Sequence, residues 1–138
     1  MINNLPIAIR DNCLDFSWDN EKVWKLNLPV EKMAISKLAW QFDLPFWKYG
    51  KVKYAITPNQ VMANPRKFRY QYNRTMNSDL KYPVHIAKNK KGKWEMLDGL
   101  HRVVKAKALG HRTIKVKKVY KKHIKDIVKA NPAIRYQE

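Results

Sequence analysis

The strongest constraint on the fold comes from residues 94–110, where a strand pattern passes through one glycine into a helix pattern. Residues 94–98 have the apolar and aromatic side chains of a strand, and Gly99 follows directly. Residues 100–109 have the spacing of an amphipathic helix, and Gly110 stands where a helix C′ glycine is expected. The helix residues expected to face the core are Leu100, Val103, Val104 and Ala108. This order predicts a domain with helices packed on a sheet.

The turn at Gly99 has the properties of an anion-binding site. The first N–H groups of a helix have no partner within the helix, and the helix dipole is positive at that end. Gly99 allows the backbone to approach a ligand closely, and the next turn holds His101 and Arg102. Two cationic side chains are unfavourable beside the positive end of a helix unless an anion binds there. The segment therefore predicts a phosphate site.

A purely structural interpretation of the same residues stays open. Asp98 can be the N-cap of the helix, with Gly99 easing the turn. His101 and Arg102 are then a solvated first helical turn that binds no ligand. The pattern alone does not separate the two interpretations.

The rest of the chain predicts further helices and strands. Residues 1–30 indicate an irregular or strand-bearing arm that Trp18 and Trp24 anchor to the core. Apolar residues recur with helical spacing over residues 31–42, so we expect a helix there. The other expected elements are a strand over 52–56, a short helix from Thr57-Pro58, a helix from Asn64-Pro65 over about 66–76, a β-hairpin with strands near 84–86 and 94–96, a strand over 114–119, and an amphipathic helix from Tyr120 that ends at Asn131-Pro132. Together they predict the α/β (α+β) class, a small domain with a mixed sheet flanked by helices.

One order of motifs stands out between Ile56 and Val119. An Asp-Gly-x-His-Arg box at residues 98–102 is followed by Ala-x-x-x-Gly, which ends at Gly110. The flanking matches are Ile56-Thr57-Pro58 after a strand, Asn64-Pro65 before a helix, Tyr82-Pro83-Val84-His85-Ile86 as a strand, and Ile114-Lys115-Val116 as the next strand. This order covers nearly half of the chain and resembles the ParB/sulfiredoxin superfamily. The division that the resemblance implies within one compact unit is an N-terminal arm and helix (1–50), a ParB/sulfiredoxin-like domain (51–120), and a C-terminal basic helix and tail (121–138).

The resemblance implies a nucleotide ligand, because the box in that superfamily holds nucleotide phosphates at a helix N-terminus. ATP, ADP or CTP is the expected ligand, and Mg²⁺ brought in with the nucleotide stays open. The implied phosphate contacts are Gly99, Leu100, His101 and Arg102. The helix after Asn64-Pro65 would add Lys67, Tyr70 and Arg74, whose i, i+3 and i+7 spacing places them on one face. The alternative for that helix is that Phe68 and Tyr72 face the core and its basic side chains are only solvated.

The form of the box is closest to the free-serine kinases of the superfamily, which use a carboxylate as base toward a small hydroxyl substrate. The resemblance therefore implies Asp98 as base or magnesium ligand, and His101 and Arg102 as catalytic partners of a phosphotransferase or NTP hydrolase. Glu31 is a weaker candidate for the base. Leu100 stands where sulfiredoxins have their catalytic Cys, which argues against their reduction chemistry. The roughly 20 residues after the last matched strand leave no room for the helix-turn-helix domain of ParB proteins.

The charge of the chain favours a polyanionic partner. Its 138 residues include 29 Lys and Arg against 11 Asp and Glu, a net charge of +18. Residues 81–138 hold 17 basic and 4 acidic residues, whereas residues 1–80 hold 12 and 7. The second expected function is therefore that of a non-enzymatic or nuclease-like accessory protein that binds nucleic acid through this basic half. Its candidate contacts are Lys115, Lys117, Lys118, Lys121, Lys122 and Lys125.

Several other classes are disfavoured. No run of about 18 apolar residues predicts a transmembrane helix, and the first twelve residues lack the features of a signal peptide. Cys13 is the only cysteine, which suits a reducing cytoplasm and argues against a thiolate zinc site. The four histidines show no metal-ligand spacing, so we expect no protein metal site. Aromatic residues cluster over residues 40–54, where Leu44-Pro45-Phe46-Trp47 can form one wall of a pocket.

Overall fold

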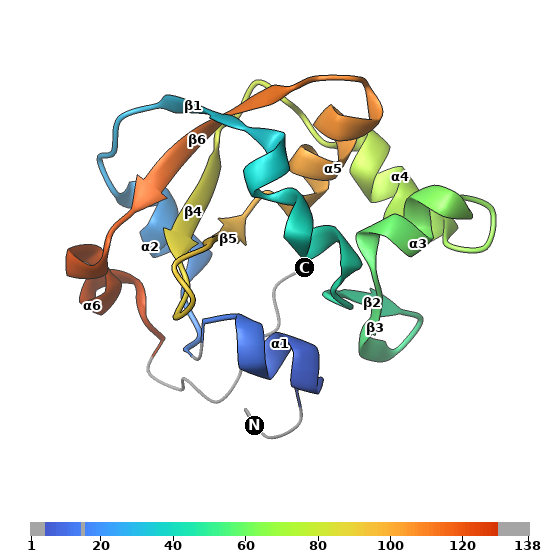
Figure 1. The fold of residues 1–138 in the computed structure, drawn as a ribbon, viewed down its shortest axis with the longest axis horizontal. Helices are drawn as coiled ribbons and strands as arrows, with labels where there is room; N and C mark the ends of the chain where they lie inside the picture. The colour runs from blue at the N-terminus through green and yellow to red at the C-terminus, as the bar shows by residue number, and fades with distance from the viewer. Residues whose placement is uncertain (1–4, 15, 130–138) are drawn as a thin grey trace.

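A four-stranded sheet forms the centre of the fold in a computed structural model, which describes residues 5–14 and 16–129 (Figure 1). The strands lie in the order β1 (Glu31–Ala34), β6 (Thr113–Val119), β4 (Val84–Lys88) and β5 (Trp94–Asp98). β4 and β6 run parallel, and the other two neighbouring pairs are antiparallel. The expected class, a mixed sheet flanked by helices, is confirmed.

Side chains alternate between the two faces of this sheet and build two cores. Val84, Ile86 and Val116 belong to the larger core, which also holds side chains of α3 (Pro58–Ala63) and α5 (Leu100–Ala108) and the Phe68 ring that precedes α4 (Arg69–Asn77). Ala87 and Val119 belong to the smaller core on the other face, with side chains of α2 (Asn20–Lys25) and α6 (Ile124–Ile127). Figure 1 shows α2 and α6 on one side of the sheet and α3, α4 and α5 on the other.

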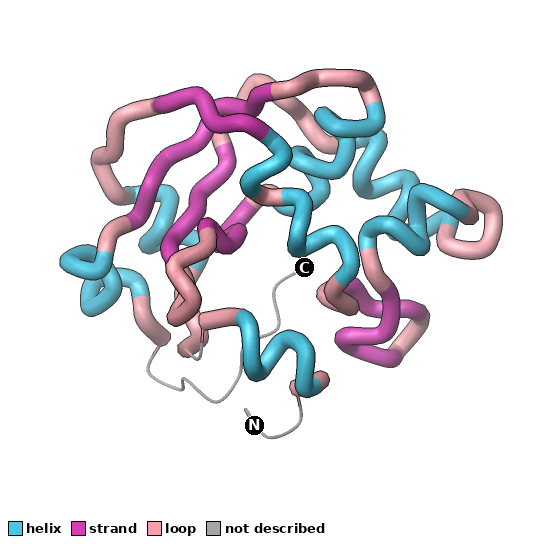
Figure 2. Tube along the Cα trace, in the orientation of Figure 1, coloured by secondary structure: helices cyan, strands magenta, loops and turns pink. Residues whose placement is uncertain are grey.

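A separate hairpin of β2 (Trp47–Tyr49) and β3 (Val52–Ile56) lies beside α3 (Figures 1 and 2). Gly50 has φ +61° at its turn, a conformation that glycine adopts without strain. Trp47 is buried and fixes the hairpin to the larger core. The N-terminal helix α1 (Ile7–Asn12) forms a small third cluster with Cys13, and Trp40 and Tyr54 pack against it.

Most local signals in the sequence act as expected. Thr57 caps α3, and with Gln60 it forms a capping box in which each side chain accepts from the other's backbone N–H. The β4–β5 hairpin closes at Asn89, whose Oδ1 accepts from the backbone N–H groups of Lys91 and Lys93 at 2.9 and 3.0 Å. Gly110 follows α5 with φ +86° and ends it.

The predicted helix over residues 31–42 is wrong. Residues 31–34 form β1, and the two 3₁₀ helices η2 (Ile35–Lys37) and η3 (Ala39–Asp43) follow. Met33 and Ile35 are both buried, and this spacing of two residues suits the face of a strand, whereas the i, i+4 spacing that predicted a helix begins only at Ala34. Pairing of β1 with β6 decides between them, because it satisfies the backbone groups of this segment at the edge of the sheet.

Four smaller expectations also need correction. The arm over residues 1–30 was expected to be irregular or strand-bearing, but it contains the helices α1 and α2. In α5, Ala106 is buried and Ala108 is exposed, because the buried stripe ends two residues earlier than the pattern indicated. Trp18 is buried as expected, but the Trp24 side chain is 55% exposed. The predicted C-terminal helix is short: η4 (Lys121–His123) and α6, with Val128 as C-cap. The expected stop at Asn131-Pro132 lies outside the described residues. No helix in the described part of the chain is long and apolar enough to cross a membrane.

Candidate functional site

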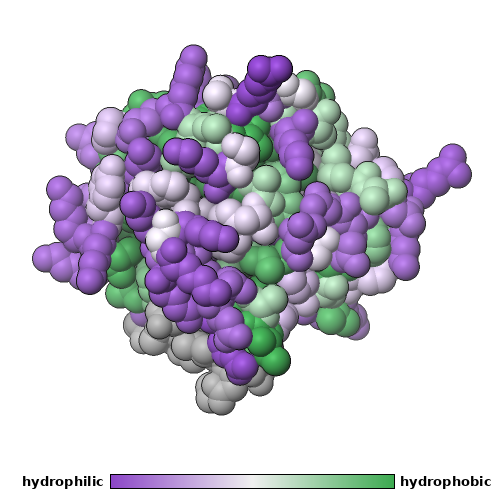
Figure 3. Space-filling model, viewed as in Figure 1, coloured by the Kyte–Doolittle hydropathy of each residue, from purple (hydrophilic) through white to green (hydrophobic). Residues whose placement is uncertain are grey.

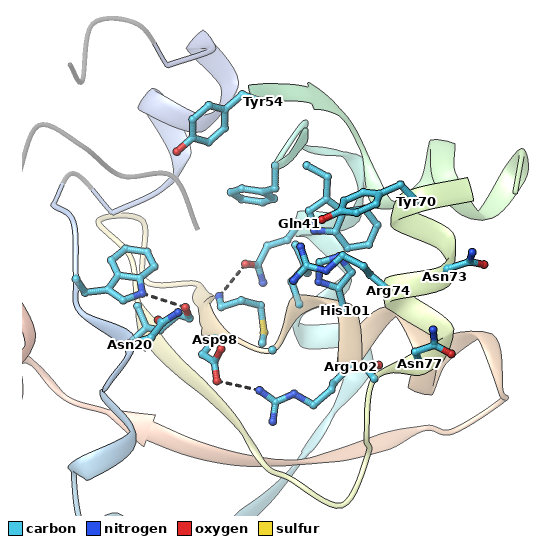
Figure 4. A pocket seen from close by; sticks show the side chains of 18 residues that line it. Asn20, Gln41, Tyr54, Tyr70, Asn73, Arg74, Asn77, Asp98, His101 and Arg102 are labelled. Carbon is cyan, nitrogen blue, oxygen red and sulfur yellow. Dashed lines mark hydrogen bonds and ion pairs between the residues drawn. The ribbon is translucent and has the colours of Figure 1, made fainter. Parts of the chain in front are cut away.

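A pocket of about 640 Å³ opens where β5 ends and α5 begins (Figure 4). One wall comes from α4, a second from Phe46 and Trp47, and a third from Trp18 and Asn20 of the N-terminal arm. Seven predicted site residues line it: Tyr70, Arg74, Asp98, Gly99, Leu100, His101 and Arg102. The fold thus brings α4 and the Asp-Gly-x-His-Arg box together, although about 25 residues separate them in the sequence.

Lys67 is the one predicted phosphate contact that lies elsewhere. α4 begins at Arg69, and Lys67 belongs to the preceding turn, where its backbone N–H donates to Asn64 Oδ1 at 3.3 Å. The expected common helical face of Lys67, Tyr70 and Arg74 therefore does not form. The Lys67 ammonium lies 5.4 Å from the centre of the Phe68 ring and lines a neighbouring hollow.

Gly99 is required by the fold at the base of the pocket. Its φ of +103° lies in the left-handed region, which L side chains rarely adopt. A Cβ atom at this position would lie 2.5 Å from Val84 Cγ1 and 3.0 Å from Arg102 Nη2. The glycine thus permits close contact between the start of α5 and β4, in addition to the access for a ligand that the sequence suggested.

Within the described part of the chain, the N-cap position of α5 supplies no side-chain cap, because it is Gly99, which has no side chain. Asp98 ends β5, and its carboxylate bonds elsewhere, so the interpretation of Asp98 as the helix cap is wrong. The first N–H groups of α5 therefore keep their capacity to donate to a ligand at the pocket edge.

Asp98 and Arg102 form an ion pair at the floor of the pocket (Figure 4). Arg102 Nη2 donates to Asp98 Oδ2 at 2.8 Å, and Trp24 Nε1 donates to the same oxygen at 2.9 Å. His85 Nδ1 lies 3.9 Å from it. The other carboxylate oxygen, Oδ1, accepts no hydrogen bond within the described part of the chain. Asp98 therefore retains one oxygen that can accept a proton or coordinate a cation.

Arg102 acts as a clamp between elements. Besides Asp98, its guanidinium reaches the carbonyl oxygens of Tyr82 and Pro83, to which Nη1 donates at 3.2 and 3.0 Å. These bonds join the first turn of α5 to the loop before β4. Most of the donor capacity of Arg102 is thus used within the protein.

His101 is a neutral side chain in this site. Burial lowers its pKa to about 3, and the nearby Arg74 guanidinium adds to the shift. The ring lies flat on Trp47, with centroids 4.3 Å apart and an interplanar angle of 5°. The expected cationic pair of His101 and Arg102 is therefore wrong, because only Arg102 carries a charge at neutral pH.

Gln71 sets the proton position on His101. Gln71 Nε2 donates to the carbonyl of Lys48 at 3.2 Å, so its Oε1 is directed to His101 Nε2, 2.8 Å away. Because an amide oxygen only accepts, Nε2 carries the ring proton and Nδ1 has the free lone pair. The sequence pattern did not indicate Gln71. Trp47 was indicated only as part of the expected aromatic wall, and both Phe46 and Trp47 line the pocket.

The cationic side of the pocket comes from α4. Arg74 lies beside Tyr70, with its guanidinium carbon 5.9 Å from the ring centre, and Figure 4 shows both above His101. The Tyr70 ring is 56% exposed and available for stacking. Tyr54, farther along the wall, has φ +53°, so the pocket includes a non-glycine residue in the left-handed region.

The lysines of the basic C-terminal half do not form one continuous face. Lys115 and Lys117 alternate with Lys118 across β6. Lys118 pairs with Glu31 at 3.2 Å and lies over the Trp94 ring, and Lys117 is half-buried. Lys121, Lys122 and Lys125 are exposed beyond the sheet. In Figure 3 hydrophilic side chains are spread over all of the visible face, rather than gathered at one end.

The described residues contain no group of three or more His, Cys, Asp or Glu side chains that could hold a metal ion. Glu31, the weaker candidate for a base, lies at the outer edge of the sheet in β1 and does not line the pocket. Comparisons with protein-family models, curated proteins and solved structures found no match for this chain. The functional interpretation therefore relies on the geometry of the pocket.

Proposed function

We propose that the protein binds a nucleotide, as the resemblance to the ParB/sulfiredoxin superfamily implies, with the phosphates at the N-terminus of α5. The observation that carries the proposal is the uncapped start of α5, which opens into a pocket that also holds Arg74 and an exposed aromatic ring. Backbone N–H groups, the positive end of a nine-residue helix and a guanidinium together favour an anion.

The roles of the side chains follow from their contacts. The N–H groups of the first α5 turn would donate to phosphate oxygens, and Arg74 would supply the positive charge. Tyr70 offers a ring face on which a base can stack. Trp47 and Gln71 would hold His101 as a neutral residue. The Nδ1 atom of His101 would then accept a hydrogen bond from the ligand. Arg102 would position Asp98 instead of binding phosphate directly.

Asp98 is the group through which we propose chemistry, as a phosphotransferase or NTP hydrolase. Its Oδ1 would take a proton from a hydroxyl group or a water molecule. The oxygen of that hydroxyl or water would bond to the terminal phosphorus as the bridging P–O bond breaks and the rest of the nucleotide leaves. Mg²⁺ is compatible with this site, because it needs only one or two carboxylates when phosphates supply its other ligands. When bound, it would neutralise phosphate charge. Cys13 is buried and is the only cysteine of the chain, so it has no internal disulfide partner, which suits the proposed cytoplasmic location.

Thermal unfolding in the presence of ATP, ADP or CTP, with and without Mg²⁺, tests the proposal. A ligand that binds only the folded protein adds about 2.7 kcal/mol of stability at 100 times its Kd. We expect Arg74→Ala to abolish the rise in unfolding temperature. Arg69→Ala is the matched control, because Arg69 lies on the same helix and does not line this pocket. The proposal fails if none of the nucleotides raises the unfolding temperature, or if the two variants respond alike.

A further inference from the structure

We propose that a second surface, adjacent to the pocket, binds single-stranded nucleic acid. The surface is a hollow of about 410 Å³ between the β2–β3 hairpin and the start of α4. We call it the hairpin groove, and the residues that carry the argument are Lys48, Tyr49, Lys67, Phe68, Arg69 and Tyr70. The hairpin groove shares Tyr70 with the nucleotide pocket, but its other residues line only the groove, so the inference does not depend on nucleotide binding.

The charge of the groove comes from a stretch of chain without acidic residues. Residues 44–78 contain no Asp or Glu. Their seven basic residues are Lys48, Lys51, Lys53, Arg66, Lys67, Arg69 and Arg74. The flanking carboxylates are engaged elsewhere: Asp43 accepts from Asn59 at 2.6 Å, and Asp79 lies 3.8 Å from Lys81. A polyanion on this face therefore meets little local repulsion.

The cations that line the groove have no competing carboxylate. Among the described residues, Lys48, Lys67 and Arg69 form no ion pair with Asp or Glu. Lys67 and Arg69 are exposed. A phosphate backbone can thus bind them without first breaking an internal salt bridge, and each contact releases counterions from the nucleic acid.

Aromatic rings alternate with these cations. Tyr70 is 56% exposed and Tyr49 is 46% exposed. The Lys48 ammonium lies 5.2 Å from the Tyr70 ring centre, and Lys67 lies 5.4 Å from that of Phe68. Tyr49 packs edge-on against Phe68 at 5.2 Å, which holds its ring in place. Ring faces paired with nearby cations are the means by which proteins bind single strands, since bases stack and phosphates pair with the charges.

The rings favour a single strand over a duplex and over an acidic peptide. Stacking on Tyr49 or Tyr70 needs an unpaired base, because paired bases present only their edges. An acidic peptide would use the lysines but would leave the exposed rings without a flat partner. Tyr70 lines both the hairpin groove and the pocket, so a bound strand can pass from one to the other.

Fluorescence anisotropy with labelled 12-mers of dT and rU, and with a 12-bp duplex, tests this inference on the full chain between 50 and 200 mM salt. We expect single strands to bind more tightly than the duplex. Lys48→Gln combined with Lys67→Gln should reduce affinity about tenfold and lower the salt slope by about 1.4, near 0.7 for each lost contact. The control is Lys121→Gln with Lys122→Gln, which removes the same charge from exposed positions outside the groove. We expect it to bind like the unmodified protein.

Tyr49→Leu separates stacking from charge. Leucine keeps an apolar contact with Phe68 but offers no ring, so we expect weaker single-strand binding with an unchanged salt slope. Three results overturn the inference: equal losses in the groove and control pairs, duplex binding at least as tight as single-strand binding, or full competition by a poly-glutamate peptide of equal length. The nucleotide response in thermal unfolding should persist in the groove pair, which distinguishes failure here from failure of the pocket proposal.

Discussion

The imidazole of His101 lies parallel to the indole of Trp47, with ring centroids 4.3 Å apart. Trp47 is 2% exposed and belongs to the hairpin β2–β3, whereas His101 belongs to the first turn of α5. With the bond to Gln71, this stacking holds a neutral histidine at the entrance to an uncapped helix. Three elements distant in sequence thus determine the protonation state of one ring.

The neutral state of His101 predicts a pH-dependent stability. The pKa of His101 is about 3 in the folded protein and near 6.5 when unfolded. Between these values the unfolded chain binds a proton that the folded protein does not, so stability falls as pH decreases from about 6.5 toward 3. We expect a loss of about 1–2 kcal/mol between pH 7 and pH 5 from this ring. Urea unfolding at the two pH values measures it.

The variant His101→Gln assigns that loss to His101. Burial also lowers the pKa of His85, so the protein as a whole should lose more than one histidine explains. His101→Gln should remove only the share of His101, so its stability should fall less between pH 7 and pH 5 than that of the unmodified protein. An unaltered pH dependence in His101→Gln would show that the ring is already protonated or solvated in the folded protein.

A methyl group at position 99 should be costly. Gly99→Ala forces an L side chain to φ +103° and into contact with Val84, so we expect a loss of about 2–4 kcal/mol in the free energy of unfolding. Gly92→Ala is the control, because Gly92 also has positive φ but nothing lies within 4 Å of its Cβ position. That variant should lose only about 1 kcal/mol. Equal losses in the two variants, measured by chemical unfolding, would refute a packing role for Gly99.

The clamp role of Arg102 predicts that lysine cannot replace it. Lysine keeps the charge but lacks the planar fork that reaches Asp98 and the Tyr82 and Pro83 carbonyls together. Arg102→Lys should therefore lower the free energy of unfolding by about 2 kcal/mol. Arg112→Lys changes an exposed arginine and should stay within about 0.5 kcal/mol of the unmodified protein. Thermal or urea unfolding of the two variants decides whether the fork matters.

Local signals made much of the fold predictable. Thr57-Pro58 and Gly110 determine backbone conformation through their own chemistry, so the helix ends that they mark were found correctly. The strand at residues 31–34 was not predicted, because the helical spacing of the apolar residues from Ala34 to Phe42 was extended back over it, although that spacing belongs to the 3₁₀ segment that follows. The pairing of this strand with Thr113–Val116, some 80 residues later, decides the outcome, and no local pattern records it.

The site was predictable to a similar extent. The box at residues 98–102 and the residues Tyr70 and Arg74 meet in one pocket, as their order in the chain suggested. The charge of His101 was not predictable, since it depends on Trp47 and Gln71 packing around the ring. Lys67 lies outside α4 because the helix begins at Arg69, about three residues after its expected start, and sequence signals seldom locate a helix end within that distance.

Asp98→Asn separates binding from chemistry at the proposed nucleotide site. The amide keeps an oxygen that can accept from Arg102 and Trp24, but it cannot take a proton as a carboxylate does. Nucleotide affinity should hold or increase, because a negative charge beside the phosphates is removed. The rate of phosphoryl transfer or hydrolysis should fall about 10²–10⁴-fold. Isothermal titration measures the affinity, and a phosphate-release assay measures the rate. Arg74→Ala is the comparison variant, and we expect it to lose nucleotide affinity. A variant that binds and turns over nucleotide like the unmodified protein would exclude Asp98 as the base.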